Sequence, residues 1–242
     1  MTLSFEAPDR RVIAIVQARL SSERLPGKVL RPIGGRPLLG HLIDRLRLVR
    51  ELNGVVLATS SEASDDPLAA FAQQEGMRCY RGPLEDVASR ILQAAISDGA
   101  DGFVRISGDS PLIAPEIVSW AVSLFRQQWP DLVTNVATRS FPKGQSVEIL
   151  KTATFRGALR DFETAEDREH VTPFFYRYPD RFRILSFARQ KPLESLQLSV
   201  DCEEDFQRVE TLIKRMNRPP ASYGLDDIIG LLPERSATEA GA

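Results

Sequence analysis

An uninterrupted run of five apolar residues, 12–16, constrains the fold of this 242-residue chain most strongly. A strand with one face in water alternates apolar and polar side chains, whereas a strand covered by helices on both faces is apolar throughout. Residues 12–16 therefore predict a fully buried strand of a parallel sheet.

Strand-like and helix-like segments alternate along the chain after this run. The helix-like segments carry apolar residues at helical spacing, and most are ended by a glycine. The predicted strands are residues 55–58, 78–80, 103–106 and 132–134, with a helix before each of them. This alternation predicts an α/β fold of three layers with a mostly parallel sheet.

The pattern changes between Asn135 and Leu150, where Pro142 and Gly144 interrupt short β-like runs. We expect an insertion there, in the form of a hairpin used for dimer contact or acceptor binding. Further strands are predicted at residues 181–187 and 196–200, and a last helix ends near Met216. The sequence thus predicts one domain over residues 10–216 and a C-terminal tail over 217–242, disordered beyond Pro233.

Composition excludes several classes of function. The chain carries 31 cationic and 33 anionic side chains, so its net charge gives no reason to expect nucleic acid or an anionic membrane as a partner. It has no run of about 18 apolar residues that would span a membrane, and residues 1–11 do not resemble a signal peptide. The two cysteines are far apart in sequence, and we expect a reduced, cytoplasmic protein.

A basic loop follows the first strand, with cations at Arg19, Arg24 and Lys28 beside two serines and a glycine. Cations and backbone amides at the carboxyl end of a buried strand suit a polyphosphate. The loop lacks the patterns of a P-loop and of a dinucleotide fingerprint. From spacing alone, a solvated basic loop that caps the sheet is an equally good interpretation.

Residues 17–28 resemble the signature of the sugar-acid cytidylyltransferases, which activate acylneuraminates and Kdo as CMP-sugars. The similarity is greatest to the branch named after spore coat polysaccharide biosynthesis protein F, and it continues through residues 105–113, 168–173 and 200–205. It implies a nucleotide-diphospho-sugar transferase-like (Rossmann-like) fold. It also implies transfer of CMP from CTP to an acidic or amino sugar, with release of pyrophosphate, in an enzyme that could be a homodimer.

The resemblance assigns the nucleotide to Ala18, Arg19, Arg24 and Lys28, with Lys28, Arg19 and Asp109 in catalysis. Asp109 follows the strand 103–106, and a carboxylate that faces a triphosphate needs a cation between them, for which Mg²⁺ is suited. A turn aspartate bonded to its own backbone is the alternative. The resemblance makes Asp109 a Mg²⁺ ligand.

Asp201 is the second expected Mg²⁺ ligand, again from the resemblance. It precedes the last helix, and Glu204 three residues later approximates a capping box, so an N-cap aspartate is the alternative. The two roles are compatible. We expect Asp205 to be a solvated helix residue.

Four further residues complete the expected site. Ser60 and Arg90 would contact the base or ribose, although residues 60–66 could simply be a polar loop and helix cap. Glu148 and His170 would lie near the acceptor, although a lone histidine is more often a structural hydrogen-bonding group. Ser146 stands where this branch has an aspartate, which leaves the acceptor open.

Two other functions remain possible from the sequence. One is a catalytically inactive nucleotide-binding subunit of a glycan-assembly complex, for which Ser146 is the only support. The other is a glycosyltransferase, which would normally use an Asp-x-Asp pair that this sequence lacks.

Overall fold

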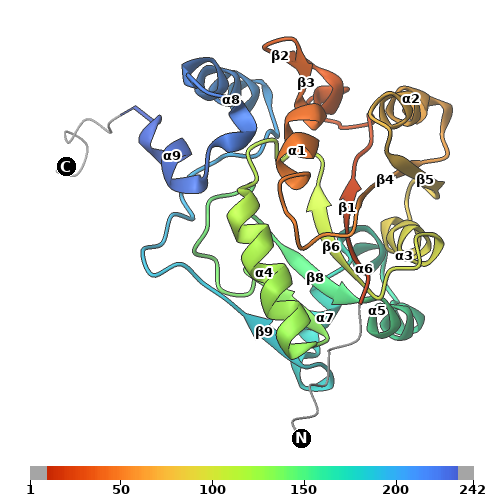
Figure 1. Cartoon of the computed structure of the whole chain (residues 1–242). Helices are drawn as coiled ribbons and strands as arrows, with labels where there is room; N and C mark the ends of the chain where they lie inside the picture. Colours follow the sequence, from red (N-terminus) through yellow and green to blue (C-terminus); the bar gives the residue numbers. More distant parts are fainter. Residues whose placement is uncertain (1–9, 234–242) are drawn as a thin grey trace, which may run out of the picture.

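The computed structural model describes residues 10–233. A seven-stranded sheet forms its centre, in the order β5-β4-β1-β6-β8-β7-β9 (Figure 1). The strands are Val12–Gln17 (β1), Val55–Ser60 (β4), Arg78–Gly82 (β5), Gly102–Ser107 (β6), Leu132–Thr134 (β7), Glu148–Lys151 (β8) and Ile184–Ser186 (β9), and Pro32–Ile33 (β2) pairs with Arg36–Pro37 (β3). The α-helices are Leu38–Leu46 (α1), Asp66–Gln74 (α2), Val87–Ser97 (α3), Pro115–Gln128 (α4), Thr152–Ala158 (α5), Ala165–His170 (α6), Pro173–Arg177 (α7), Glu203–Arg215 (α8) and Leu225–Gly230 (α9).

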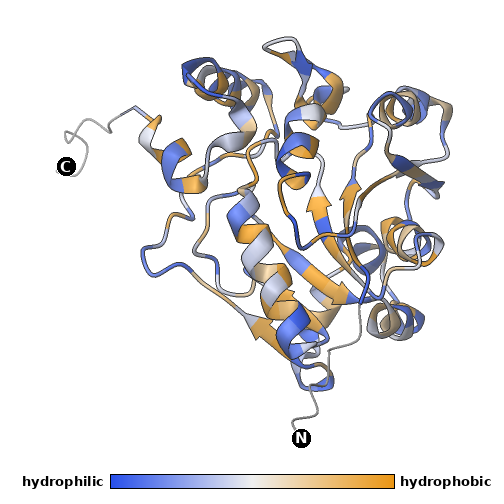
Figure 2. Cartoon of the chain, in the orientation of Figure 1, coloured by the Kyte–Doolittle hydropathy of each residue, from blue (hydrophilic) through white to orange (hydrophobic). Residues whose placement is uncertain are grey.

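The strand β1 lies inside the sheet between β4 and β6, parallel to both. Its residues Val12, Ala14 and Val16 belong to a buried cluster that also holds residues of α1, α2, α4, α8 and α9, whereas Ile13 and Ile15 belong to a second cluster, with residues of α3, α5 and α7. All five are fully buried, because helices cover both faces of the sheet. Figure 2 shows the apolar strands between helices whose outer faces are polar. The predicted three-layer α/β fold is confirmed.

The segment expected to form a hairpin does not form one. Residues 135–147 contain no strand, and Glu148–Lys151 is strand β8 of the main sheet, antiparallel to both β6 and β7. The Asn135 side chain bridges the segment, since Nδ2 donates to the Gln145 carbonyl at 2.7 Å and Oδ1 accepts from the Val147 amide at 2.8 Å. A side-chain amide thus replaces the hydrogen-bond ladder of a hairpin.

The C-terminal part of the prediction also needs correction. Residues 196–200 form no strand, and only an isolated bridge joins Lys143 to Gln197. Residues 217–233 belong to the domain, because α9 packs into the core through Leu225 and Ile228. The disorder predicted beyond Pro233 falls outside the described residues.

A buried arginine holds this C-terminal segment in place. Arg45 of α1 is fully buried and donates to the carbonyls of Tyr223 at 2.8 Å and Pro220 at 2.7 Å. Burial lowers the pKa of Arg45 to about 10. The domain therefore extends past the predicted boundary at residue 216. Within residues 10–233, no helix is both long and apolar enough to span a bilayer.

Candidate active site

The basic loop folds back on itself after β1. The Gly27 amide donates to the Leu20 carbonyl at 3.0 Å, and the Leu20 amide donates to Asp65 Oδ1 at 2.8 Å. Gly27 has φ of 70°, a left-handed conformation that glycine adopts without strain. The loop therefore turns into the protein at its end, and Lys28 is 8% exposed.

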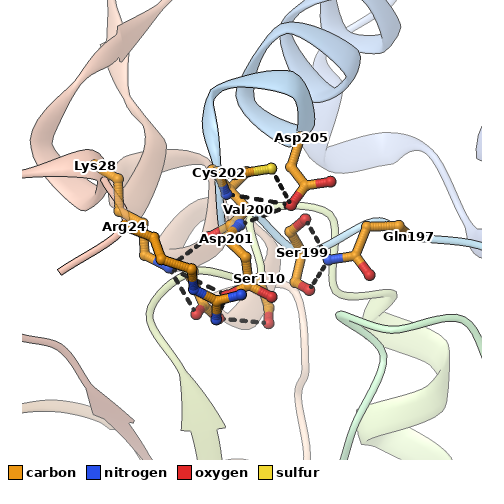
Figure 3. A network of polar contacts seen from close by, with 10 residues as sticks. Arg24, Lys28, Ser110, Gln197, Ser199, Val200, Asp201, Cys202 and Asp205 are labelled. Atoms are coloured by element: carbon orange, nitrogen blue, oxygen red, sulfur yellow. Dashed lines mark hydrogen bonds and ion pairs between the residues drawn. The ribbon is translucent and has the colours of Figure 1, made fainter. Parts of the chain in front are cut away.

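The Lys28 ammonium lies between two carboxylates (Figure 3). Its Nζ is 3.2 Å from Asp109 Oδ2 and 3.5 Å from Asp201 Oδ1, and it donates to the Val200 carbonyl at 2.5 Å. Arg24 approaches Asp201 Oδ1 at 3.3 Å from the same loop. The structure thus brings together residues 28, 109 and 201, which the sequence analysis chose from three separate segments.

Asp201 is not the N-cap of α8. Cys202 holds that position, and the side chain that caps the helix is Asp205, whose Oδ2 accepts from the amides of Asp201 at 3.0 Å and Cys202 at 3.3 Å. The expectation that Asp205 is solvated was therefore wrong, because capping buries it to 6% exposure. The Asp201 carboxylate is left to face Lys28 and Arg24.

This donor set fits Mg²⁺. Asp109 and Asp201 converge on one cation, the Lys28 ammonium, and their side chains are 22% and 34% exposed. Mg²⁺ takes one or two carboxylates and completes its shell with phosphate oxygens and water. No group of three or more potential metal-binding side chains occurs in the described part of the chain, so these two carboxylates suit an ion that arrives with phosphate.

A cleft of about 520 Å³ opens above this cluster. Of the expected nucleotide-binding residues, Ala18, Arg19, Arg24, Lys28 and Arg90 line it. Arg19 Nη2 lies 3.2 Å from Glu169 Oε1. Burial lowers the pKa of Arg90, and its Nη1 donates to the Leu84 carbonyl at 3.1 Å.

Ser60 does not reach this cleft. It is fully buried, and its Oγ donates to Asp65 Oδ2 at 2.5 Å. Since Asp65 also holds the Leu20 amide, Ser60 acts on the basic loop through Asp65. A local polar sequence could not distinguish this structural contact from contact with a ligand.

A second cleft, of about 1170 Å³, adjoins the first. Ser107, Asp109 and His170 line both clefts, so the two meet at the carboxyl end of β6. Glu148, which the resemblance places near the acceptor, and Ser146 line the second cleft. Gly108 allows the chain after β6 to lie close to the end of β1, because a Cβ there would lie 2.8 Å from Ala18 Cβ.

His170 precedes a strained turn. Val171 has φ of 72° and ψ of −54°, and the Thr172 amide donates across it to the His170 carbonyl at 2.8 Å. This γ-turn is rare for a β-branched residue and costs about 1–3 kcal/mol. Val171 is fully buried, and its packing holds His170 and Thr172 at the second cleft.

The sequence analysis assigned no role to two residues that support Glu148, namely Arg105 and Tyr176. Arg105 Nε donates to Gln17 Oε1 at 2.9 Å and Nη1 to Glu148 Oε2 at 2.9 Å, and Tyr176 Oη donates to Glu148 Oε1 at 2.5 Å. The signal for Arg105 was its position inside an otherwise apolar strand. Nothing local marked Tyr176, because it lies in an aromatic helical segment.

Comparisons with known proteins show which family the sequence belongs to. Residues 13–226 match the family model described as cytidylyltransferase. The chain is 29% identical to spore coat polysaccharide biosynthesis protein SpsF of Bacillus subtilis over 96% of this chain and 98% of that protein. It is 28% identical to a 3-deoxy-manno-octulosonate cytidylyltransferase of Acidobacterium capsulatum over 84% and 96% of the two chains.

A solved structure supports the same assignment. A cytidylyltransferase from Leptospira borgpetersenii superimposes with a TM-score of 0.87 at 28% identity, covering 92% of this chain and 93% of that one. The fold is the nucleotide-diphospho-sugar transferase fold that the resemblance implied. By its sequence and its fold, the chain belongs to the cytidylyltransferase family.

Proposed function

We propose that this chain transfers CMP from CTP to an acidic or amino sugar, with release of pyrophosphate and with Mg²⁺, for the synthesis of a surface polysaccharide. The observation that carries the proposal is the cluster of Lys28, Asp109 and Asp201, which lines the smaller cleft and reaches the second cleft at Asp109. A cleft that holds several arginines and a lysine, next to a larger cleft, suits a reaction that joins a nucleotide to a second substrate. The names of the two relatives support a sugar product.

The residues of the site have different roles in this reaction. Arg19, Arg24 and Lys28 bind the triphosphate and neutralise the charge that develops on the leaving pyrophosphate. Asp109 and Asp201 would hold Mg²⁺, which when bound polarises the phosphoryl oxygens. An acceptor oxygen in the second cleft attacks the α-phosphorus from the side of Ser107 and His170. The bond from the α-phosphorus to the bridging oxygen breaks, and pyrophosphate leaves.

Pyrophosphate release tests the proposal. The protein is incubated with Mg²⁺ and each of the four nucleoside triphosphates, with a panel of sugar acids and amino sugars, and the CMP-sugar product is identified by mass. We expect pyrophosphate to be released from CTP only when an acceptor is present. The Asp109→Asn variant should not release it, because the amide keeps the shape of the carboxylate and loses its charge. If CTP binds but no product forms with any acceptor, the alternative of a catalytically inactive nucleotide-binding subunit would be favoured.

A further inference from the structure

We propose that Asp65 is the positioning residue of the basic loop: its buried carboxylate holds the start of the loop in the conformation that binds a polyphosphate. This inference rests on the proposed function and deepens it, because the triphosphate of CTP would be the ligand of that loop. Asp65 is fully buried, has no cation among its hydrogen-bond partners in the described residues, and lines neither cleft. A buried carboxylate is costly unless hydrogen bonds satisfy it, so its partners indicate its role.

Asp65 stands where a helix cap would stand, but its side chain does not cap the helix. It is the residue before α2, and its carboxylate accepts no hydrogen bond from the first turn. Oδ1 instead accepts from the Leu20 amide at 2.8 Å, and Oδ2 accepts from the Ser60 amide at 3.2 Å and from Ser60 Oγ at 2.5 Å. The carboxylate thus joins the chain that follows β1 to the end of β4.

This contact replaces a hydrogen bond of the sheet. In a pair of parallel strands, every second amide donates to the neighbouring strand. The Ala18 amide follows this rule and donates to the Ala58 carbonyl at 3.2 Å. Two residues further on, the Leu20 amide would donate to the Ser60 carbonyl, but it donates to the carboxylate of Asp65 instead. The carboxylate therefore fixes the point at which the loop leaves the sheet.

Leu20 anchors the cations of the loop through both of its backbone groups. Its amide is held by Asp65, and its carbonyl accepts from the Gly27 amide at 3.0 Å. The loop is closed by this second bond, with Arg19 immediately before the closure and Lys28 immediately after it. Both cations line the smaller cleft. If the Leu20 amide loses its acceptor, the two cations lose their common anchor.

The charge of Asp65 also acts on the smaller cleft. Burial alone would raise the pKa of Asp65, but the hydrogen bonds from Ser60 and Leu20 outweigh burial and hold that pKa below its usual range. Arg90 lines the smaller cleft; burial and the nearby Arg19 charge lower the pKa of Arg90, and the Asp65 charge opposes them. An ionised Asp65 thus stabilises the cations of the cleft before a polyphosphate binds.

Asp65→Asn tests this role with little change of shape. An amide side chain has one accepting oxygen, so it cannot accept from both the Leu20 and the Ser60 amide, and one of them is left facing an NH2 group. Calorimetry in the presence of Mg²⁺ measures the Kd of CTP and of inorganic triphosphate. Both should rise about tenfold or more, the change expected if the binding conformation of the loop falls to about a tenth of the population. The KM for the acceptor should change little.

Inorganic triphosphate separates this role from direct contact with the base. It lacks base and ribose, so we expect parallel losses of affinity for CTP, UTP and triphosphate. Ser60→Ala keeps the carboxylate and its bonds to both amides, and it should show the same pattern with a smaller loss. A changed preference between CTP and UTP at unchanged triphosphate affinity, in either variant, would mean that these residues read the base, and the proposal would be wrong.

Amide hydrogen exchange, followed by NMR, tests the anchor itself in the wild-type protein without ligand. The Leu20 amide should exchange more slowly than the amides of residues 21–25, which donate no hydrogen bond to the described residues. The matched control is Asp98→Asn, because the Asp98 side chain is 2% exposed and binds Arg11 and Arg78 at the amino ends of β1 and β5. This control should lower the Tm and leave the binding of CTP and triphosphate unchanged.

Three further outcomes would overturn the proposal: unchanged triphosphate affinity in Asp65→Asn, free exchange of the Leu20 amide in the wild type, or an equal loss of affinity in Asp98→Asn. The exchange measurement decides even if Asp65→Asn does not fold. A wild type that binds no triphosphate would also overturn it. Failure of the proposed function is a separate result, namely a wild type that binds triphosphate but neither binds CTP nor releases pyrophosphate.

Discussion

Replacing Lys28 by methionine should lower the stability of the nucleotide-free protein. It should also leave Asp109 and Asp201 available to bind a cation. The ammonium is nearly buried and touches three oxygens, on Asp109, Asp201 and the Val200 carbonyl. Methionine keeps the apolar stem and removes the charge. The two carboxylates would then repel each other, with only Arg24 left beside Asp201.

The size of the effect follows from the contacts. A hydrogen bond to a charged group contributes about 1.5–3 kcal/mol, and the 3.5 Å contact adds little because the side chain of Asp201 is 34% exposed. We expect the free energy of unfolding to fall by about 3 kcal/mol, equivalent to a Tm decrease of roughly 6–12 °C for a chain of this size. Mg²⁺ at ten times its Kd should then restore about 1.4 kcal/mol.

Thermal unfolding with and without Mg²⁺, together with calorimetry of CTP binding, measures both effects. Lys191→Met, at an exposed lysine without an ion pair among the described residues, is the control. Mg²⁺ alone should stabilise the Lys28 variant more than the wild type, and CTP should bind the variant more weakly. If Lys28→Met matched the control in Tm and in CTP affinity, the basic loop would be only a solvated cap of the sheet.

Three further variants test other parts of the structure. Asp205→Ala should lower the free energy of unfolding by about 1–2 kcal/mol through loss of the helix cap, measured by urea unfolding, and an unchanged midpoint would contradict the assignment of the cap. Gly108→Ala should cost about 1–3 kcal/mol and weaken CTP binding, because the new Cβ would lie 2.9 Å from the Gln17 carbonyl oxygen; normal CTP affinity would show that β1 and β6 can separate without harm. Burial lowers the pKa of His41, so the unfolded state takes up a proton first and stability should fall as the pH drops below about 6.5. That decline should be shallower in His41→Gln, and identical pH profiles would exclude His41 as its source.

Local sequence determined much of the fold. The apolar run at Val12–Val16 could only be buried, and the alternation of strands and helices required a sheet covered on both faces. The basic loop and Asp109 were candidates because both follow the carboxyl ends of predicted parallel strands, and the resemblance to the cytidylyltransferases favoured ligand binding over a structural role. Local reasoning failed for Glu148–Lys151, since the short strand pairs with β6 and β7, far away in the sequence.

Tertiary structure alone decided how the site is completed. Asp201 could be a cap or a ligand until Asp205 was seen to hold the helix end, which frees Asp201 to face Lys28. Only the structure shows that both oxygens of the Glu148 carboxylate accept from distant protein groups, Arg105 and Tyr176. The partner that each of these groups takes depends on which residues, distant in sequence, the packing brings within hydrogen-bond distance. A local pattern of residue types cannot predict this.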